Sequence, residues 1–185
     1  MKEGASREAC FSTIVEPAFF IAMGSITALT NVNSFENLKM ILYTSTPYGI
    51  MIIALLAITL FIMLLIEGCR VPVDDPTTHL ELTMIHEVMV LDNSGVDLAF
   101  ITWGSAIKIF IFESLIAALI IPFNIAPIIS IPLFLGVTTV LSMIVGTVES
   151  SMARFRMTHV FEFVFVMSIT ALLVLTLVTY GIYGN

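Results

Sequence analysis

The fold is decided by the apolar run Gly49-Ile-Met-Ile-Ile-Ala-Leu-Leu-Ala-Ile-Thr-Leu-Phe-Ile-Met-Leu-Leu-Ile66 and by the polar stretch that follows it, Glu67-Gly-Cys-Arg-Val-Pro-Val-Asp74. The apolar run contains no charged residue, and about 20 apolar residues let a helix cross the hydrocarbon core of a bilayer. The change to charged residues at Glu67 is typical of a helix that reaches the membrane surface. The sequence therefore predicts a transmembrane helix over Gly49–Ile66, followed by a charged loop.

The composition supports the same conclusion for the whole chain. Of its 185 residues, 58% are hydrophobic and 11% are charged, and the mean hydropathy is +1.06. An ordinary soluble domain has about 45–50% apolar and about 25% charged residues. The formal net charge of -7 repels phosphate backbones. The composition thus excludes a soluble enzyme and a nucleic-acid-binding protein.

Four further apolar segments are long enough to cross a membrane. They are Phe11–Leu29, Leu98–Ile121, Ile125–Val148 and Val160–Tyr183. Pro127 and Pro132 lie in the first turns of the Ile125–Val148 segment, where a proline is tolerated or causes a modest kink. We therefore expect one all-α domain over residues 1–185, a polytopic membrane helix bundle of five transmembrane helices with a long cytoplasmic loop over Glu67–Asp97.

The basic residues predict the orientation of this bundle, because positive charge concentrates on the cytoplasmic side of membrane proteins. With the N-terminus inside, the outer surface carries only Lys39. The inner surface then carries Lys2, Arg7, Arg70, Arg154 and Arg156. We expect a multi-pass protein of the cell inner membrane with its N-terminus inside and its C-terminus outside.

Four ionisable side chains fall inside the apolar segments, namely Glu16, Lys108, Glu113 and Glu162. Such residues are costly in hydrocarbon and usually pair with a cation, line a hydrated path or mark a coupling site. Lys108 is expected near the middle of its helix and Glu113 past the middle. Because they are i, i+5, they lie on different faces, and each should meet another helix. Glu16 and Glu162 lie near helix ends, where a structural surface role is the alternative.

The loop over Glu67–Asp97 holds the densest group of ionisable residues. An apolar stripe at helical spacing follows Pro76 and consists of Leu80, Met84, Val88 and Leu91. This stripe predicts a short amphipathic helix packed on the bundle or on a partner, with its Glu and His side chains placed to pass protons. The alternative is an acidic loop that pairs with Arg70 for structural reasons only.

The residue pattern gives little support to a metal or cofactor site. His79 and His86 are i, i+7 rather than the i, i+4 of a zinc helix, and neither they nor His159 lie mid-membrane as haem ligands would. Cys10 and Cys69 are too few for an iron–sulfur cluster, which usually needs four thiolates. We expect no catalytic residue, metal or cofactor in this chain.

The polar stretch after the Gly49–Ile66 segment resembles the subunit 1 family of respiratory complex I. That family has Glu-x-x-Arg-x-Pro-x-Asp after a transmembrane helix and a later Glu-Leu pair. The matching residues here are Glu67, Arg70, Pro72, Asp74, Glu81 and Leu82. Arg7 and Glu16 are similar to residues that open an earlier family helix, and Arg154-Phe155-Arg156 resembles the last inner loop. The resemblance covers the whole chain and implies that it matches the C-terminal five of about eight family helices.

Departures from this pattern favour one branch of the family. The acidic run of complex I is replaced by Pro76-Thr77-Thr78-His79, and a distal Glu-Tyr is replaced by Met89-Val90. The stretch from Pro72 to Asp92 is instead very similar to the membrane subunit of formate hydrogenlyase and other group 4 nickel–iron hydrogenases. This resemblance implies a cofactor-free subunit that docks the hydrogenase large and small subunits and the iron–sulfur subunits on its cytoplasmic face, beside antiporter-like membrane subunits. The iron–sulfur clusters and the nickel–iron centre are expected in those partners.

Residue chemistry and resemblance together suggest two sets of site residues. A coupling path for protons is expected on Glu16, Glu67, Asp74, Glu81, His86 and Glu87. Structural or docking roles are expected for Arg7, Arg70, Pro72, Arg154 and Arg156. Arg70 should hold Asp74, Glu67 or Glu81. For Arg154 and Arg156, the alternative is that their positive charge only anchors the loop on the cytoplasmic side. Two other functions stay open, a quinone-interacting subunit 1 of a complex I-like dehydrogenase and a stand-alone ion transporter.

Overall fold

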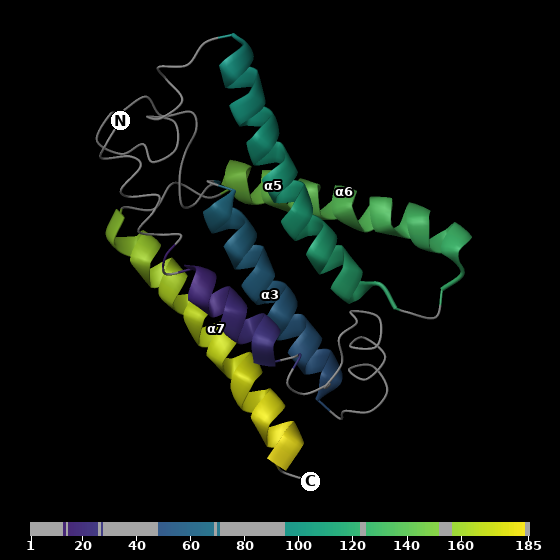
Figure 1. Cartoon of the computed structure of the whole chain (residues 1–185), viewed down its shortest axis with the longest axis vertical. Coiled ribbons are helices and arrows are strands. Elements are labelled where there is room, and N and C mark those ends of the chain that lie inside the picture. The colour runs from purple at the N-terminus through teal and green to yellow at the C-terminus, as the bar shows by residue number, and fades with distance from the viewer. Residues whose placement is uncertain are drawn as a thin grey trace.

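The computed structural model of the chain is helical through almost all of the residues that it describes, which are 13, 15–25, 27, 48–68, 70, 95–122, 125–151 and 157–183. Its long helices are α3 (Gly49–Glu67), α5 (Val96–Ile120), α6 (Pro127–Ser151) and α7 (Met157–Tyr183) (Figure 1). All four are long and apolar enough to cross a membrane, and a shorter apolar helix covers Val15–Ser25. The expectation of an all-α, multi-pass membrane bundle is confirmed.

The four long helices overlap the corresponding predicted segments, while only residues 13, 15–25 and 27 of the predicted Phe11–Leu29 segment are described. α3 extends to Glu67, and α7 begins at Met157 rather than at Val160. Pro127 is the first residue of α6, where its missing N–H would have no helical partner in any case. The helix continues through Pro132, as expected for a membrane helix in which neighbours tolerate a proline.

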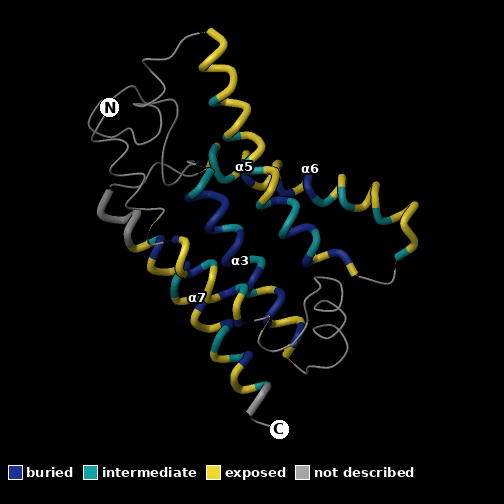
Figure 2. The backbone as a smooth tube through the Cα atoms, in the orientation of Figure 1, coloured by how far each residue is buried: buried dark blue, intermediate teal, exposed yellow. Residues whose placement is uncertain are grey.

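α3 is the central helix of the bundle. It packs against α7 on one side and against α5 on the other, while α5 in turn contacts α6 (Figure 1). Most of α3 is therefore buried, whereas most of α5 and α6 is exposed (Figure 2). An unbroken apolar surface suits the central position, because a helix with neighbours on several sides has no face left for polar groups.

α3 and α7 each bury a repeat in which spacings of three and four residues alternate. The buried positions are Ile52, Leu56, Thr59, Met63 and Ile66 on α3, and Val164, Met167, Ala171, Val174 and Val178 on α7. This spacing is typical of helices that pack at a small crossing angle. The Thr59 hydroxyl also lies 3.0 Å from that of Thr170 on α7, so a polar contact joins the two helices within the apolar interface.

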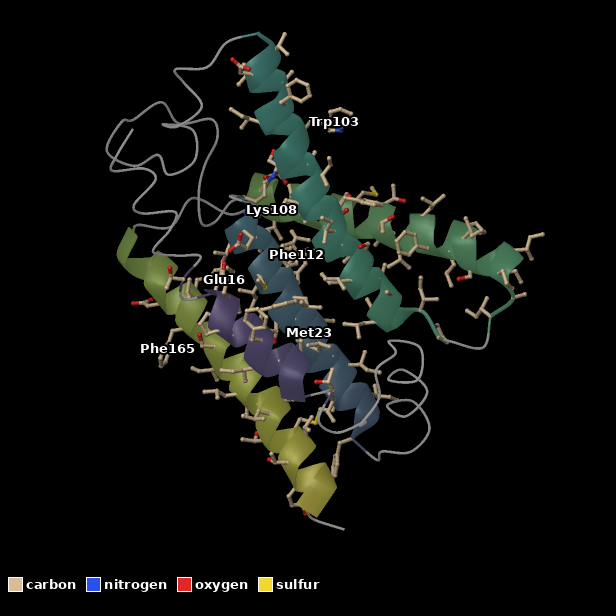
Figure 3. The ribbon with its side chains drawn as sticks, viewed as in Figure 1. Glu16, Met23, Trp103, Lys108, Phe112 and Phe165 are labelled. Carbon is tan, nitrogen blue, oxygen red and sulfur yellow. The ribbon has the colours of Figure 1, made fainter. Side chains whose placement is uncertain are left out.

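α5 and α6 leave the bundle over part of their length. The first turns of α5 extend past the C-terminal end of α3, and Trp103 on this segment points away from the other helices (Figures 1 and 3). The N-terminal half of α6 extends away from α3 and α7 and exposes Ile128, Ile129 and Ile131. In a membrane protein such apolar faces meet lipid or neighbouring subunits.

Candidate functional site

The C-terminal end of α3 is tied to α5 by an ion pair. The Lys108 Nζ lies 2.7 Å from a carboxylate oxygen of Glu67, the last residue of α3. The Glu67 side chain is 11% exposed and that of Lys108 is 43% exposed. This pairing neutralises a lysine that lies within an apolar helix, and it sets the end of α3 beside the middle of α5 (Figure 3).

Lys108 lies near the middle of α5, as the sequence predicts, and it is also level with the end of α3. The physical reason is a shift of α5 along its axis relative to α3, so that the first turns of α5 project past its neighbour. A hydropathy profile gives the length of each apolar helix and not the offset between two of them.

A second ion pair joins the residues just after α3 to the end of α6. The Arg70 backbone N–H donates a hydrogen bond of 3.0 Å to the Leu65 carbonyl, which folds the chain back over the last turn of α3. The Arg70 guanidinium donates to the Glu149 carboxylate over 3.1 Å, and the two side chains are 35% and 27% exposed. Among the described residues, Arg70 therefore pairs with Glu149 on α6, and Glu67 pairs with Lys108. Asp74 and Glu81, the other expected partners of Arg70, lie outside the described residues.

Glu113 of α5 is buried at 3% exposure and faces α6. The Ser142 hydroxyl donates to its carboxylate, with distances of 2.8 and 3.0 Å to the two oxygens. The same hydroxyl lies 3.2 Å from the Thr138 carbonyl one turn earlier in α6. Lys108 and Glu113 thus contact different helices, α3 and α6, as their spacing on α5 predicts.

These side chains meet at a partly open pocket between α5 and α6 with a volume of about 370 Å³. Arg70, Glu113, Ser142 and Glu149 supply its polar wall, and the remaining wall includes Ile109, Phe110 and Val145. We call Glu67, Arg70, Lys108, Glu113, Ser142 and Glu149 the polar cluster. The polar cluster thus consists of two ion pairs, Lys108–Glu67 and Arg70–Glu149, and of the Glu113–Ser142 contact between α5 and α6.

Two members of the polar cluster, Ser142 and Glu149, were not predicted as site residues. Thr138, Ser142 and Glu149 are i, i+4, i+11 in a segment whose only charged residue is Glu149, so they share one face of α6. This polar stripe is the signal that could have identified them. Glu113, the partner on α5, is predicted as an intramembrane charged residue, but the sequence does not indicate which helix it meets.

The other predicted site residues have separate positions. Glu16 lies exposed on the Val15–Ser25 helix, and Glu162 lies exposed on α7. Eight predicted site residues lie outside the described residues, namely Arg7, Pro72, Asp74, Glu81, His86, Glu87, Arg154 and Arg156. The predicted amphipathic helix after Pro76 also lies outside them. Among the residues that are described, no group of three or more His, Cys, Asp or Glu side chains could hold a metal ion.

Comparison with known proteins identifies the family of the chain. The family model described as NADH dehydrogenase matches residues 3–180, which is nearly the whole sequence. No curated protein and no solved structure matches the chain. The match agrees with the Glu67–Asp74 pattern and with the multi-pass helical architecture. The chain therefore belongs to the NADH dehydrogenase family, the subunit 1 family of complex I.

Proposed function

We propose that this chain is the integral membrane subunit of a membrane-bound nickel–iron hydrogenase complex of the formate hydrogenlyase type. In this proposal it anchors the cytoplasmic redox subunits and helps couple hydrogen evolution to the movement of protons or sodium ions across the inner membrane. Family membership supports the coarser part, that the chain is a membrane subunit of a complex I-like oxidoreductase. The observation that carries the finer part is the similarity of Pro72–Asp92 to the hydrogenase branch.

The geometry supports a coupling role. The Pro72–Asp92 stretch follows directly on Arg70, whose side chain is bound to Glu149 on α6. A partner that docks on this stretch would act on the residues at the end of α3, and these belong to the polar cluster. Charged groups joined across helices in this way can respond together when one of them changes its protonation or its partner.

Redox cofactors belong to the partner subunits in this proposal. The chain contains two cysteines, Cys10 and Cys69, while an iron–sulfur cluster usually needs four thiolates. We propose that the hydrogenase large and small subunits and iron–sulfur subunits dock on the cytoplasmic face, and that antiporter-like subunits lie beside it in the membrane.

Purification of the native complex, with mass spectrometry of the subunits that accompany this chain, tests the proposal. We expect a hydrogenase large subunit, iron–sulfur subunits and hydrogen evolution in the purified material. Co-purification with flavin-containing NADH dehydrogenase subunits and quinone reduction would instead support the complex I-like alternative, which the family description favours. Ion conduction by the chain reconstituted alone would support a transporter and reject both.

A further inference from the structure

The pocket between α5 and α6 is lined by the buried carboxylate of Glu113, which is not part of the predicted coupling path. Glu113 is 3% exposed, and both of its carboxylate oxygens lie within hydrogen-bond distance of the Ser142 hydroxyl. A hydroxyl has one hydrogen, so Ser142 satisfies at most one lone pair of a group that can accept several hydrogen bonds. Ser142 therefore fills only a small part of the accepting capacity of this carboxylate, and Glu113 lines the pocket.

The charges around the pocket do not balance within the described residues. Its wall carries the positive Arg70 and the negative Glu113 and Glu149, which leaves one negative charge in excess. The Arg70 guanidinium is bound to Glu149, and Lys108, on a different face of α5, is bound to Glu67. A buried charge without a compensating partner costs several kcal/mol, so the site favours a ligand that carries a single positive charge.

The pocket also has room for such a ligand. Its volume of about 370 Å³ corresponds to about ten water molecules at roughly 30 Å³ each. The Glu113 carboxylate oxygens and the Ser142 hydroxyl oxygen are ligands of the kind that a hard cation prefers, and the partly open pocket can admit water as a further oxygen ligand. The described residues supply no second buried carboxylate beside Glu113, which argues against a divalent ion, whose higher charge usually requires more carboxylate ligands.

We propose that the Glu113–Ser142 pocket binds one monovalent cation, with Glu113 as the charged ligand and Ser142 as its positioning partner. The cation is a proton on the carboxylate or a sodium ion held by the carboxylate and hydroxyl oxygens. Cation binding rests on the pocket geometry alone. Participation of this pocket in ion translocation rests, in addition, on the proposed function.

The test uses dicyclohexylcarbodiimide, an apolar reagent that modifies protonated carboxyl groups in apolar surroundings. The carboxylic acid adds across a C=N bond of the carbodiimide, so no group leaves and the modified peptide gains the full mass of the reagent. Native membranes that contain the whole complex are treated at several pH values, in potassium or sodium buffer of equal ionic strength, and mass spectrometry locates the adduct. We expect an adduct on Glu113 whose yield falls as the pH rises.

The two cations give different patterns of labelling. If sodium binds, sodium buffer protects Glu113 at constant pH while potassium buffer does not, and Ser142→Ala weakens that protection at least severalfold. If the ligand is a proton, labelling depends on pH and is the same in both buffers. Absence of a Glu113 adduct at every pH overturns the proposal, and because the wild-type chain decides this point, a poorly folded variant does not affect it.

A matched variant controls for specificity. Glu162→Gln removes an exposed glutamate of α7 and should leave the Glu113 adduct unchanged, whereas Glu113→Gln should abolish it. The result is independent of which redox subunits accompany the chain. A Glu113 adduct in a complex without a hydrogenase would support the cation site and contradict the proposed function. A hydrogenase complex in which Glu113 gives no adduct would support the proposed function and contradict the cation site.

Discussion

Arg70 and Glu149 form a contact between parts of the chain that lie far apart in sequence. The pair spans 3.1 Å and is only partly exposed, so it is screened less than a free surface pair. It connects the chain just after α3 to the last turns of α6. We therefore expect Arg70 to contribute to the packing of α6 as well as to the charge of the cytoplasmic face.

A double-mutant cycle measures this contact. Arg70→Gln and Glu149→Gln should each lower the thermal stability of the purified complex, and the double variant should be no less stable than the worse single variant. We expect a coupling free energy of about 1 kcal/mol, because the pair is partly solvated. Arg70→Lys keeps the charge with a shorter reach and should give an intermediate loss. Fully additive effects would show that the two side chains do not interact.

The expected coupling path makes a second prediction at the residue scale. Glu81→Gln and Glu16→Gln remove a charge while they keep the shape of the side chain, so the complex should still assemble. We expect ion pumping linked to hydrogen evolution to fall severalfold, and more than hydrogen evolution with an artificial electron donor. Ion uptake by membrane vesicles and hydrogen production are measured on the same preparation.

The comparison of the two activities separates the possible roles of these glutamates. Equal loss of pumping and hydrogen evolution would show that the residues support docking only. Unchanged activities in an assembled complex would assign Glu81 to a solvated acidic surface and Glu16 to a structural surface role. Glu16 is the more informative of the two, because it lies exposed on a described helix whereas Glu81 lies outside the described residues.

At the scale of the elements, the close approach of α3 and α5 depends on Gly68. A Cβ atom added at this position would lie 2.7 Å from the Leu64 carbonyl oxygen and 3.1 Å from the Ile109 Cγ1 on α5. The nearer atom belongs to the backbone of α3 itself and cannot turn aside, whereas Ile109 is a side chain of α5. The absence of a side chain at residue 68 therefore leaves room both for the last turn of α3 and for Ile109 of α5.

Gly68→Ala should consequently destabilise the complex by about 1–3 kcal/mol, the usual cost of forcing extra volume into a packed contact. Gly104→Ala is the matched control, because a Cβ there meets nothing within 4 Å and alanine favours a helix over glycine. Thermal unfolding of the detergent-purified complex compares the two variants. Equal melting temperatures for both would show that the α3–α5 contact tolerates a methyl group at residue 68.

At the scale of the whole molecule, the Arg70–Glu149 pair places the C-terminal ends of α3 and α6 on the same side of the bundle. The same arrangement follows from five spans that alternate in direction. The side that faces the cytoplasm stays a prediction from the basic residues. Orientation therefore needs a measurement on cells.

Cysteine labelling supplies that measurement. In a chain with Cys10→Ser and Cys69→Ser, Asn185→Cys should react with an impermeant thiol reagent in spheroplasts, because the C-terminus is expected outside. Ser151→Cys, at the end of α6, should react only after the membrane is permeabilised. The reverse pattern would invert the topology and place the 67–97 loop on the outer surface.

The sequence by itself determined the helical membrane architecture and the family. Long apolar runs such as Gly49–Ile66 form helices in a bilayer whatever surrounds them, because each backbone polar group must be satisfied within its own segment. The opposite faces of Lys108 and Glu113 also follow from helix geometry alone. These properties are local, so a single sequence contains them.

The tertiary structure alone decided which side chains meet. The partner of Arg70, the level of Lys108 at the end of α3, and the contact of Glu113 with Ser142 all depend on how far one helix is shifted along another. That shift results from the packing of many side chains distant in sequence, including the space that Gly68 leaves for Ile109. Helix periodicity fixes the face on which a residue lies, and only the packed bundle fixes what lies opposite that face.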